Sequence, residues 1–179
     1  TTDNERCDSA EDFADTDGID ASETCCLCGG GSSTPGETGP VCFEPLLLKG
    51  VMDFGLPGTN GKAIHLVAYE AISDLSVFGI GVANNGGGTD GQEFSFPSIT
   101  VAAGEHILLA RNIEAITTYF GDCFSIFDHV IQASTDINQN GDDAIELFRN
   151  GEVVNTYGNP DGSMSSYQDS WAYNTYSSY

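Results

Sequence analysis

Short runs of hydrophobic residues, separated by glycine-rich turns, make up most of the chain after residue 42. Alternation of apolar and polar positions within such runs is typical of β-strands. We therefore expect strands or strand fragments at residues 44–54, 62–70, 74–82, 94–96, 99–101 and 106–110. With a hairpin near Gly151 these make seven or more strands, so the pattern predicts an all-β fold, a β-sandwich.

The pattern gives more specific expectations for two stretches of the chain. In the run 62–70, Ile64, Leu66 and Ala68 should lie on one face of a sheet and His65 on the other. In the run 111–121, by contrast, apolar residues recur at nearly helical spacing, so one short helix is expected there.

The dipeptide Asn150-Gly151 between two β-rich runs predicts a hairpin, because both central residues of a type I′ turn have positive φ. That turn implies a definite strand register. The expected pairs are Arg149 with Glu152, Phe148 with Val153, Leu147 with Val154, and Ile145 with Thr156.

Just before the hairpin, Asp136, Asn138, Asn140 and Asp142 reproduce the alternating oxygen donors of a calcium loop. An EF-hand also needs a glutamate at loop position 12, where this chain has a leucine, and Glu146 is expected inside a strand. We favour a turn in which Asn140-Gly141 and Asp142-Asp143 cap the strand entry by local hydrogen bonds. Calcium binding by the four donor residues remains the alternative.

The run N-G-D-D-A-I-E-L-F-R-N-G-E-V-V-N-T-Y-G at 140–158 resembles the hallmark segment of the lamin-tail-like domain family in its extracellular form. Further likenesses follow in chain order at 60–69, 74–80, 101–110 and 169–173. The resemblance covers residues 44–173 and implies an immunoglobulin-like β-sandwich with a non-catalytic structural or adhesive role. The family usually has an acidic residue at the position of His65.

The charge balance narrows the choice of partners. Acidic residues outnumber basic ones 27 to 5, for a formal net charge of −22. Such a surface repels a phosphate backbone, so nucleic acid is not expected as a partner. Cation binding, or solubility in a salty medium, fits better.

Six cysteines indicate disulfides and an oxidising compartment, so the protein is expected to be secreted or on the cell surface. Zinc is the competing explanation, but the C-C-x-C spacing matches no common set of ligands. If the four N-terminal cysteines pair among themselves, Cys42 bonds Cys123. The candidates for disulfide bonding are Cys7, Cys25, Cys26, Cys28, Cys42 and Cys123.

The composition divides the chain into three parts. Residues 1–31 form a cysteine-rich module held by disulfides, 32–41 a Ser/Thr/Pro/Gly linker, and 42–179 the sandwich. O-linked glycosylation is expected in the linker at Ser32, Ser33 and Thr34. No apolar run reaches 18 residues, so no membrane span is expected in this segment.

No common catalytic motif is present, and we expect that the protein is not an enzyme. The leading hypothesis is a secreted structural or adhesive module, for instance the subunit of an extracellular fibre, that self-associates through its N-terminal arm or a sheet edge. The alternative is a carbohydrate- or calcium-binding accessory module of a secreted enzyme. Glycans would then stack on aromatic side chains such as Tyr157, Tyr167, Trp171 and Tyr173.

Overall fold

The structure is a computed structural model that describes residues 44–162 and 167–174. These residues belong to the unit that begins at Glu44. The module expected at 1–31, the linker at 32–41 and the glycosylation sites Ser32, Ser33 and Thr34 lie outside the described residues. So do Cys7, Cys25, Cys26, Cys28 and Cys42.

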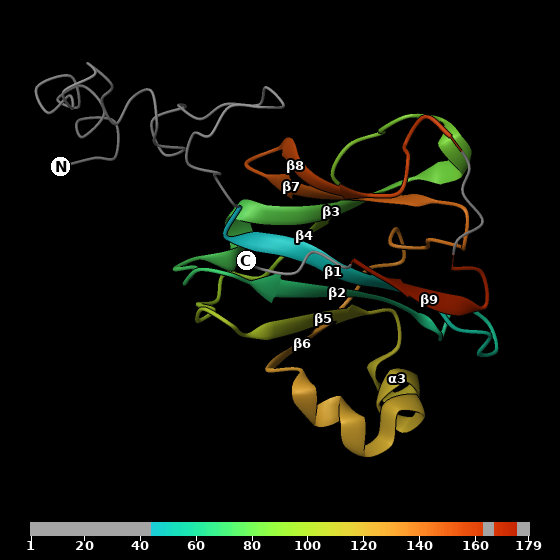
Figure 1. Cartoon of the computed structure of the whole chain (residues 1–179), viewed down its shortest axis with the longest axis horizontal. Helices are drawn as coiled ribbons and strands as arrows, with labels where there is room; N and C mark the ends of the chain where they lie inside the picture. Colours follow the sequence, from blue (N-terminus) through green and yellow to red (C-terminus); the bar gives the residue numbers. More distant parts are fainter. Residues whose placement is uncertain (1–43, 163–166, 175–179) are drawn as a thin grey trace, which may run out of the picture. The chain divides into compact units, whose positions relative to one another are not determined.

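Two β-sheets form the described part of the chain (Figure 1). The five-stranded sheet has the order β6-β5-β2-β1-β9, and the four-stranded sheet the order β4-β3-β7-β8. All neighbouring strands are antiparallel except β5 and β6. The strands are β1 (Leu46–Asp53), β2 (Lys62–Ala68), β3 (Phe78–Ala83), β4 (Phe94–Ser95), β5 (His106–Ala110), β6 (His129–Gln132), β7 (Ala144–Arg149), β8 (Glu152–Tyr157) and β9 (Ser170–Tyr173).

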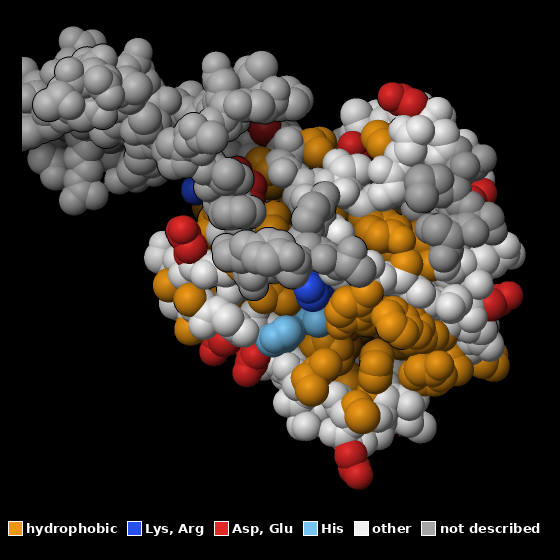
Figure 2. Space-filling view, in the orientation of Figure 1, with side chains coloured by type: hydrophobic (Ala, Val, Ile, Leu, Met, Phe, Trp, Pro, Cys, Tyr) orange, Lys and Arg blue, Asp and Glu red, His pale blue; other side chains and the backbone are white. Residues whose placement is uncertain are grey.

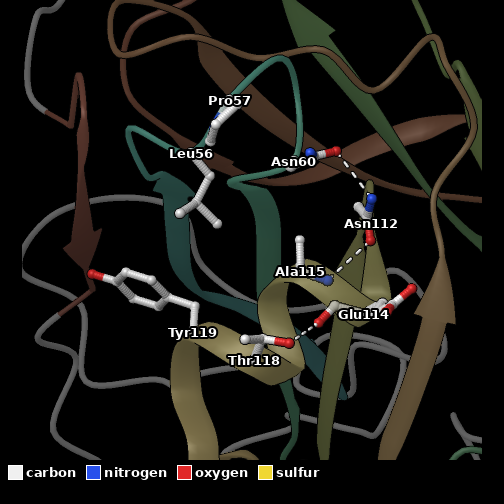
Figure 3. A pocket seen from close by; sticks show the side chains of 8 residues that line it. All are labelled: Leu56, Pro57, Asn60, Asn112, Glu114, Ala115, Thr118 and Tyr119. Carbon is white, nitrogen blue, oxygen red and sulfur yellow. Dashed lines mark hydrogen bonds between the residues drawn. The ribbon is translucent and has the colours of Figure 1, made fainter.

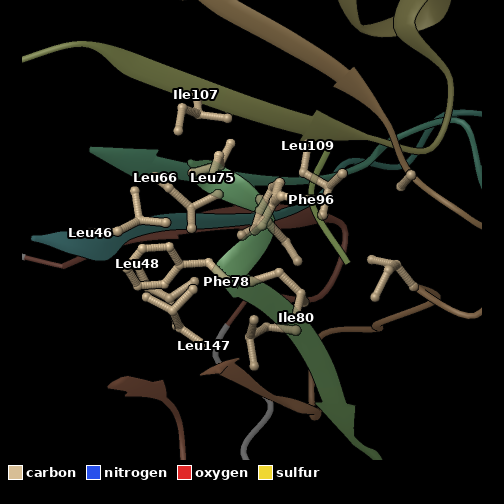
Figure 4. Packing of buried hydrophobic residues seen from close by; sticks show 14 of the residues in the cluster. Leu46, Leu48, Leu66, Leu75, Phe78, Ile80, Phe96, Ile107, Leu109 and Leu147 are labelled. Carbon is tan, nitrogen blue, oxygen red and sulfur yellow. The ribbon is translucent and has the colours of Figure 1, made fainter. Parts of the chain in front are cut away.

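The two sheets share one hydrophobic core, which is the arrangement of a β-sandwich. Leu48 and Leu66 from the larger sheet meet Ile80 and Leu147 from the smaller one, as Figure 4 shows. The expected face of β2 is confirmed, because Ile64, Leu66 and Ala68 are all buried in this core.

A β-bulge at Lys49 changes which side of β1 faces the core. Leu48 pairs with Leu66 and Gly50 with His65, so Lys49 is the extra residue. The core therefore receives Leu48 before the bulge and Val51 after it. Gly50 and Met52 consequently face the outer side of the five-stranded sheet.

Helical segments cover part of that outer side. They are α3 (Ile113–Phe120) and η5 (Gly121–Ile126). Two further 3-10 turns lie elsewhere in the fold: η3 (Leu75–Val77), whose Leu75 is buried in the core between the sheets, and η4 (Asn84–Gly86) after β3. The expected short helix is confirmed as α3, whose N-cap Asn112 accepts a hydrogen bond from the Ala115 N–H at 3.0 Å. Ile116 of α3 and Phe127 after η5 pack with outward side chains of β1, β2 and β5 in a second apolar cluster. Within the described ranges, no helix has the length and hydropathy that a membrane span requires.

Three strand expectations need correction. The run 74–82 does not begin as a strand, because the Asp74 carboxylate caps the N–H of Ser76 and starts the 3-10 turn η3. At 99–101 a single bridge joins Val101 to Ile72. The parallel strand β6 was not expected, since its four residues give no clear alternation.

The hairpin has the expected turn but only part of the expected register. Asn150 and Gly151 have φ of 52° and 86°, and the two pairs next to the turn, Arg149 with Glu152 and Phe148 with Val153, are confirmed. Beyond them a bulge at Val154 shifts the strands. The pairs expected there are wrong, because Leu147 faces Asn155 and Ile145 faces Tyr157.

The bulge at Val154 has two structural consequences. Val154 and Tyr157 both pack against the core, although three residues apart in a regular strand they would point to opposite faces. Asn155 then reaches the other sheet, where its Oδ1 accepts the Leu48 N–H at 3.0 Å. The packing of Val154 and Tyr157 and the hydrogen bond of Asn155 both depend on the second sheet. The hairpin sequence alone therefore does not predict them.

Candidate functional site

Exposed hydrophobic side chains gather on the outer side of the five-stranded sheet, around β9, α3 and η5. Five large hydrophobic side chains are exposed among the described residues, and four of them lie here: Tyr119 (52%), Ile126 (50%), Trp171 (53%) and Tyr173 (37%). Figure 2 shows this hydrophobic area beside histidine side chains. We call these four residues the aromatic face.

The antiparallel pairing of β9 with β1 explains why Trp171 and Tyr173 point outward together. Residues two apart in a strand share a side, and Ala172 between them packs toward the core. Tyr173 lies opposite Gly50, which in turn lies opposite His65. A Cβ at Gly50 would stand 2.9 Å from the Tyr173 ring, so glycine lets that ring lie across β1 and reach β2.

The aromatic face is continued by a chain of ring contacts into the protein. Trp171 packs edge-on against Tyr173 at 5.2 Å, and Tyr173 against the ring of His65 at 5.5 Å. His65 then meets Phe127 at 5.1 Å, and Phe127 meets Phe120 at 5.7 Å. The rings hold one another in place, so the face is preorganised.

His65 is 1% exposed and is held by two hydrogen bonds. Its Nδ1 lies 2.5 Å from Tyr173 Oη, and its Nε2 lies 2.8 Å from His106 Nδ1. A neutral imidazole has one donor and one acceptor nitrogen, so both bonds form with the proton on either nitrogen of His65. This agrees with the expectation that the histidine belongs to the sheet.

Burial lowers the pKa of His65 from 6.5 to about 3, with smaller contributions from the nearby His106 and Lys49. Below neutral pH the folded protein therefore keeps a neutral imidazole at this position. Burial also raises the pKa of Tyr173, so its hydroxyl keeps its proton at neutral pH.

A hollow of about 250 Å³ lies within the aromatic face, and we call it the aromatic groove. Its walls come from β1, β9, α3 and the segments that follow β1 and α3, and almost all of the side-chain atoms of the lining residues are carbon. The lining residues are Met52, Phe54, Phe120, Ile126, Phe127, Trp171 and Tyr173. Such a site suits an apolar group better than a polar one.

A second hollow, of about 470 Å³, lies on the other flank of Tyr119, whose ring stacks on Phe54 at 4.3 Å. It is more polar than the aromatic groove. The side chain of Asn112 donates to Asn60 Oδ1 at 3.0 Å, and Glu114 and Thr118 line the same hollow (Figure 3). We call it the amide hollow.

The segment proposed for calcium forms a hydrogen-bonded turn. Asp143 is 2% exposed, and its two carboxylate oxygens accept the N–H groups of Asn85 and Asn140, each at 2.8 Å. The hydroxyl of Tyr167 donates to the Asp143 carbonyl at 2.9 Å. The capping turn favoured from the sequence is thus present for Asp143. Glu146 is a residue of β7, as expected.

Calcium binding by Asp136, Asn138, Asn140 and Asp142 stays a prediction. Across residues 44–162 and 167–174, no group of three or more His, Cys, Asp or Glu side chains is arranged to hold a metal ion. Asp136 accepts a hydrogen bond from the Ser134 hydroxyl at 3.4 Å. The backbone N–H of Asn140 is bound to Asp143.

The remaining candidates are scattered over the fold. Cys123 is exposed in η5 and has no disulfide partner among the described residues, so the pairing with Cys42 stays a prediction. Of the aromatic residues suggested for glycan stacking, Trp171 and Tyr173 are exposed, whereas Tyr167 is 1% exposed. Sequence reasoning missed Tyr119 and Ile126, since exposure of an apolar residue leaves no local signal.

No known family model matches the chain, and no curated protein resembles it significantly in sequence.

Proposed function

We propose that this protein is a secreted, non-catalytic module with a structural or adhesive role, and that it contacts its partner through the aromatic face. The main support for this proposal is that four of the five large exposed hydrophobic side chains in the described part lie together. A gathered apolar surface on an otherwise highly charged protein is characteristic of an interaction site. Trp and Tyr are also the residue types most enriched at the energetic centres of interfaces.

The proposal extends to the fold family. We infer an immunoglobulin-like arrangement of the lamin-tail-like type, because the segments that resemble that family supply β2, β3, β5, β7, β8 and β9 in chain order. Members of that family are structural or adhesive modules, which supports the same role here.

A contact through the aromatic face is favoured over a contact through a sheet edge. Among the described edge strands, β4 has two residues, β6 and β9 have four each, and β8 carries a bulge. Short or bulged edges hinder the addition of a further strand. Assembly into a fibre through the N-terminal arm, residues 1–31, is part of the proposal, and electron microscopy of concentrated full-length protein would test it.

The adhesive role predicts that full-length protein carried on beads resists detachment by flow from at least one coated surface. The surfaces are the same protein, a basic protein and a neutral polysaccharide. Trp171→Ala should reduce bead retention about tenfold or more, the effect of losing about 1.4 kcal/mol at an interface. Val153→Ala is the matched control, because Val153 is 41% exposed but lies on the other sheet.

A lack of retention on all three surfaces would contradict the adhesive role. Retention that Trp171→Ala leaves unchanged would contradict only the aromatic face as the contact surface.

The amide hollow favours a second candidate function, the binding of a neutral carbohydrate. Amide, carboxylate and hydroxyl groups line it beside the half-exposed ring of Tyr119, which is the combination that sugar hydroxyls and a sugar ring face require. Tyr119→Ala should then abolish binding on a glycan array. Ile126→Ser, which lies outside this hollow, should leave such binding unchanged. An array without hits would remove the candidate.

A further inference from the structure

The aromatic groove has walls that select for an apolar group. Tyr173 Oη and the indole nitrogen of Trp171 are the only side-chain N or O atoms that its lining residues carry, and Tyr173 Oη is already bonded to His65. A sugar or an inorganic ion placed here would lose hydrogen bonds to water without replacing them. A hollow of about 250 Å³ has room for one large aromatic or aliphatic side chain.

Exposed carboxylates are carried by the same elements that line the groove, or directly precede them. Glu114 lies in the first turn of α3, Asp122 lies in η5, and Asp169 directly precedes β9; all three are exposed. The positive charge of Lys49 lies near His65. Carboxylates thus outnumber the one nearby lysine on these elements, which favours the approach of a basic side chain over an acidic one.

The net charge of the whole chain also favours a basic partner. With a formal net charge of −22, two copies repel each other, whereas a basic partner is drawn in. Three of the basic side chains in the described part are already engaged by neighbouring groups: Lys62 with Asp53, Arg111 with the Thr135 and Ile137 carbonyls, and Arg149 with Glu44. These groups are therefore poorly placed to recruit an acidic partner.

We propose that the aromatic groove binds a large aromatic or aliphatic side chain that is flanked by Lys or Arg on a partner polypeptide. This inference rests on the adhesive role proposed above and names the chemistry of the partner. The apolar side chain supplies the burial, and the flanking cations are attracted by the exposed carboxylates of α3, η5 and the residue before β9. Rings already in place limit the entropy lost on binding.

Three fluorescein-labelled peptides test the inference with the full-length chain: G-K-W-K-G, G-E-W-E-G and G-K-A-K-G. The first should bind at least tenfold more tightly than the other two in fluorescence anisotropy. Raising the salt from about 10 mM to about 1 M shortens the Debye length from about 30 Å to about 3 Å, so its binding should weaken.

Variants connect the binding to the groove. Trp171→Ala on one wall and Ile126→Ser on another should each weaken binding of G-K-W-K-G about tenfold or more, and both positions are about half exposed, so folding should be retained. Val153→Ala should bind like the wild type.

Equal binding of G-K-W-K-G and G-E-W-E-G would overturn the inference, as would binding that neither groove variant changes. Self-association that strengthens with salt and is lost in Trp171→Ala, seen by sedimentation, would assign the groove to a second copy and also overturn it. Bead retention that depends on Trp171 without peptide binding would refute only this inference. Absence of bead retention on every surface would refute the adhesive role itself.

Discussion

Lowering the pH from 7 to 4 is expected to cost the wild-type protein about 3 kcal/mol more free energy of unfolding than it costs a His65→Phe variant. The unfolded chain binds a proton at this histidine near pH 6.5, whereas the folded protein resists protonation until about pH 3. Between these values the unfolded state binds more protons, so stability falls as the pH falls. Each pH unit is worth about 1.4 kcal/mol.

Urea unfolding at pH 7, 6, 5 and 4 measures this difference. The carboxylates titrate in both proteins, so their contributions to the free energy of unfolding cancel when the two pH dependences are subtracted. Tyr173→Phe is the matched control, because it removes one hydrogen bond of His65 but keeps the ring that covers it. Since burial is the main cause of the lowered pKa, this variant should keep most of the wild-type pH dependence. Identical pH dependences for wild type and His65→Phe would show that His65 is not held neutral.

The parts of the fold that the sequence predicted are those set by local physics. Alternation in 62–70 assigned the two faces of β2 correctly, and helical spacing located α3. The Asn150-Gly151 turn and the first two pairs of its hairpin followed from the need for positive φ.

The parts of the fold that the sequence did not predict depend on contacts between the two sheets. The bulges at Lys49 and Val154 each change which side chains face the core, and the bond from the Leu48 N–H to Asn155 connects the two irregular strands. A bulge of this kind has no signature in its own strand. It is stabilised by a partner more than 100 residues away in sequence.

In the candidate site, too, the sequence did not predict a feature that depends on the tertiary structure, namely which aromatic side chains are exposed. Tyr167 and Tyr173 were both proposed as glycan-stacking residues from the sequence alone. Tyr167 is buried, because its hydroxyl donates to the Asp143 carbonyl of a distant loop, whereas Tyr173 lies on the edge strand β9 and stays exposed. Exposure is a tertiary property, so an aromatic face cannot be recognised from composition.

Asp143→Ala is expected to lower the free energy of unfolding by about 2 kcal/mol. The variant leaves the N–H groups of Asn85 and Asn140 without their acceptor, and because both bonds are only partly buried, each loss costs about 1 kcal/mol. Asp142→Ala is the matched control, since Asp142 is the less buried neighbour and should change stability by less than about 1 kcal/mol. Urea unfolding of both variants in a metal chelator gives the comparison, and a larger loss for Asp142→Ala would contradict the capping turn.

The same pair of variants decides the calcium alternative. A metal site filled at about 100 times its dissociation constant adds about 2.7 kcal/mol to the stability of the folded state. If Asp142 and its neighbours formed such a site, calcium would stabilise the wild type and Asp142→Ala would lose the effect. Because Asp143 already directs both of its oxygens to backbone N–H groups, the expected result is that millimolar calcium leaves the urea midpoints of wild type and Asp142→Ala unchanged. A calcium-dependent shift confined to the wild type would overturn the turn interpretation and restore the metal site.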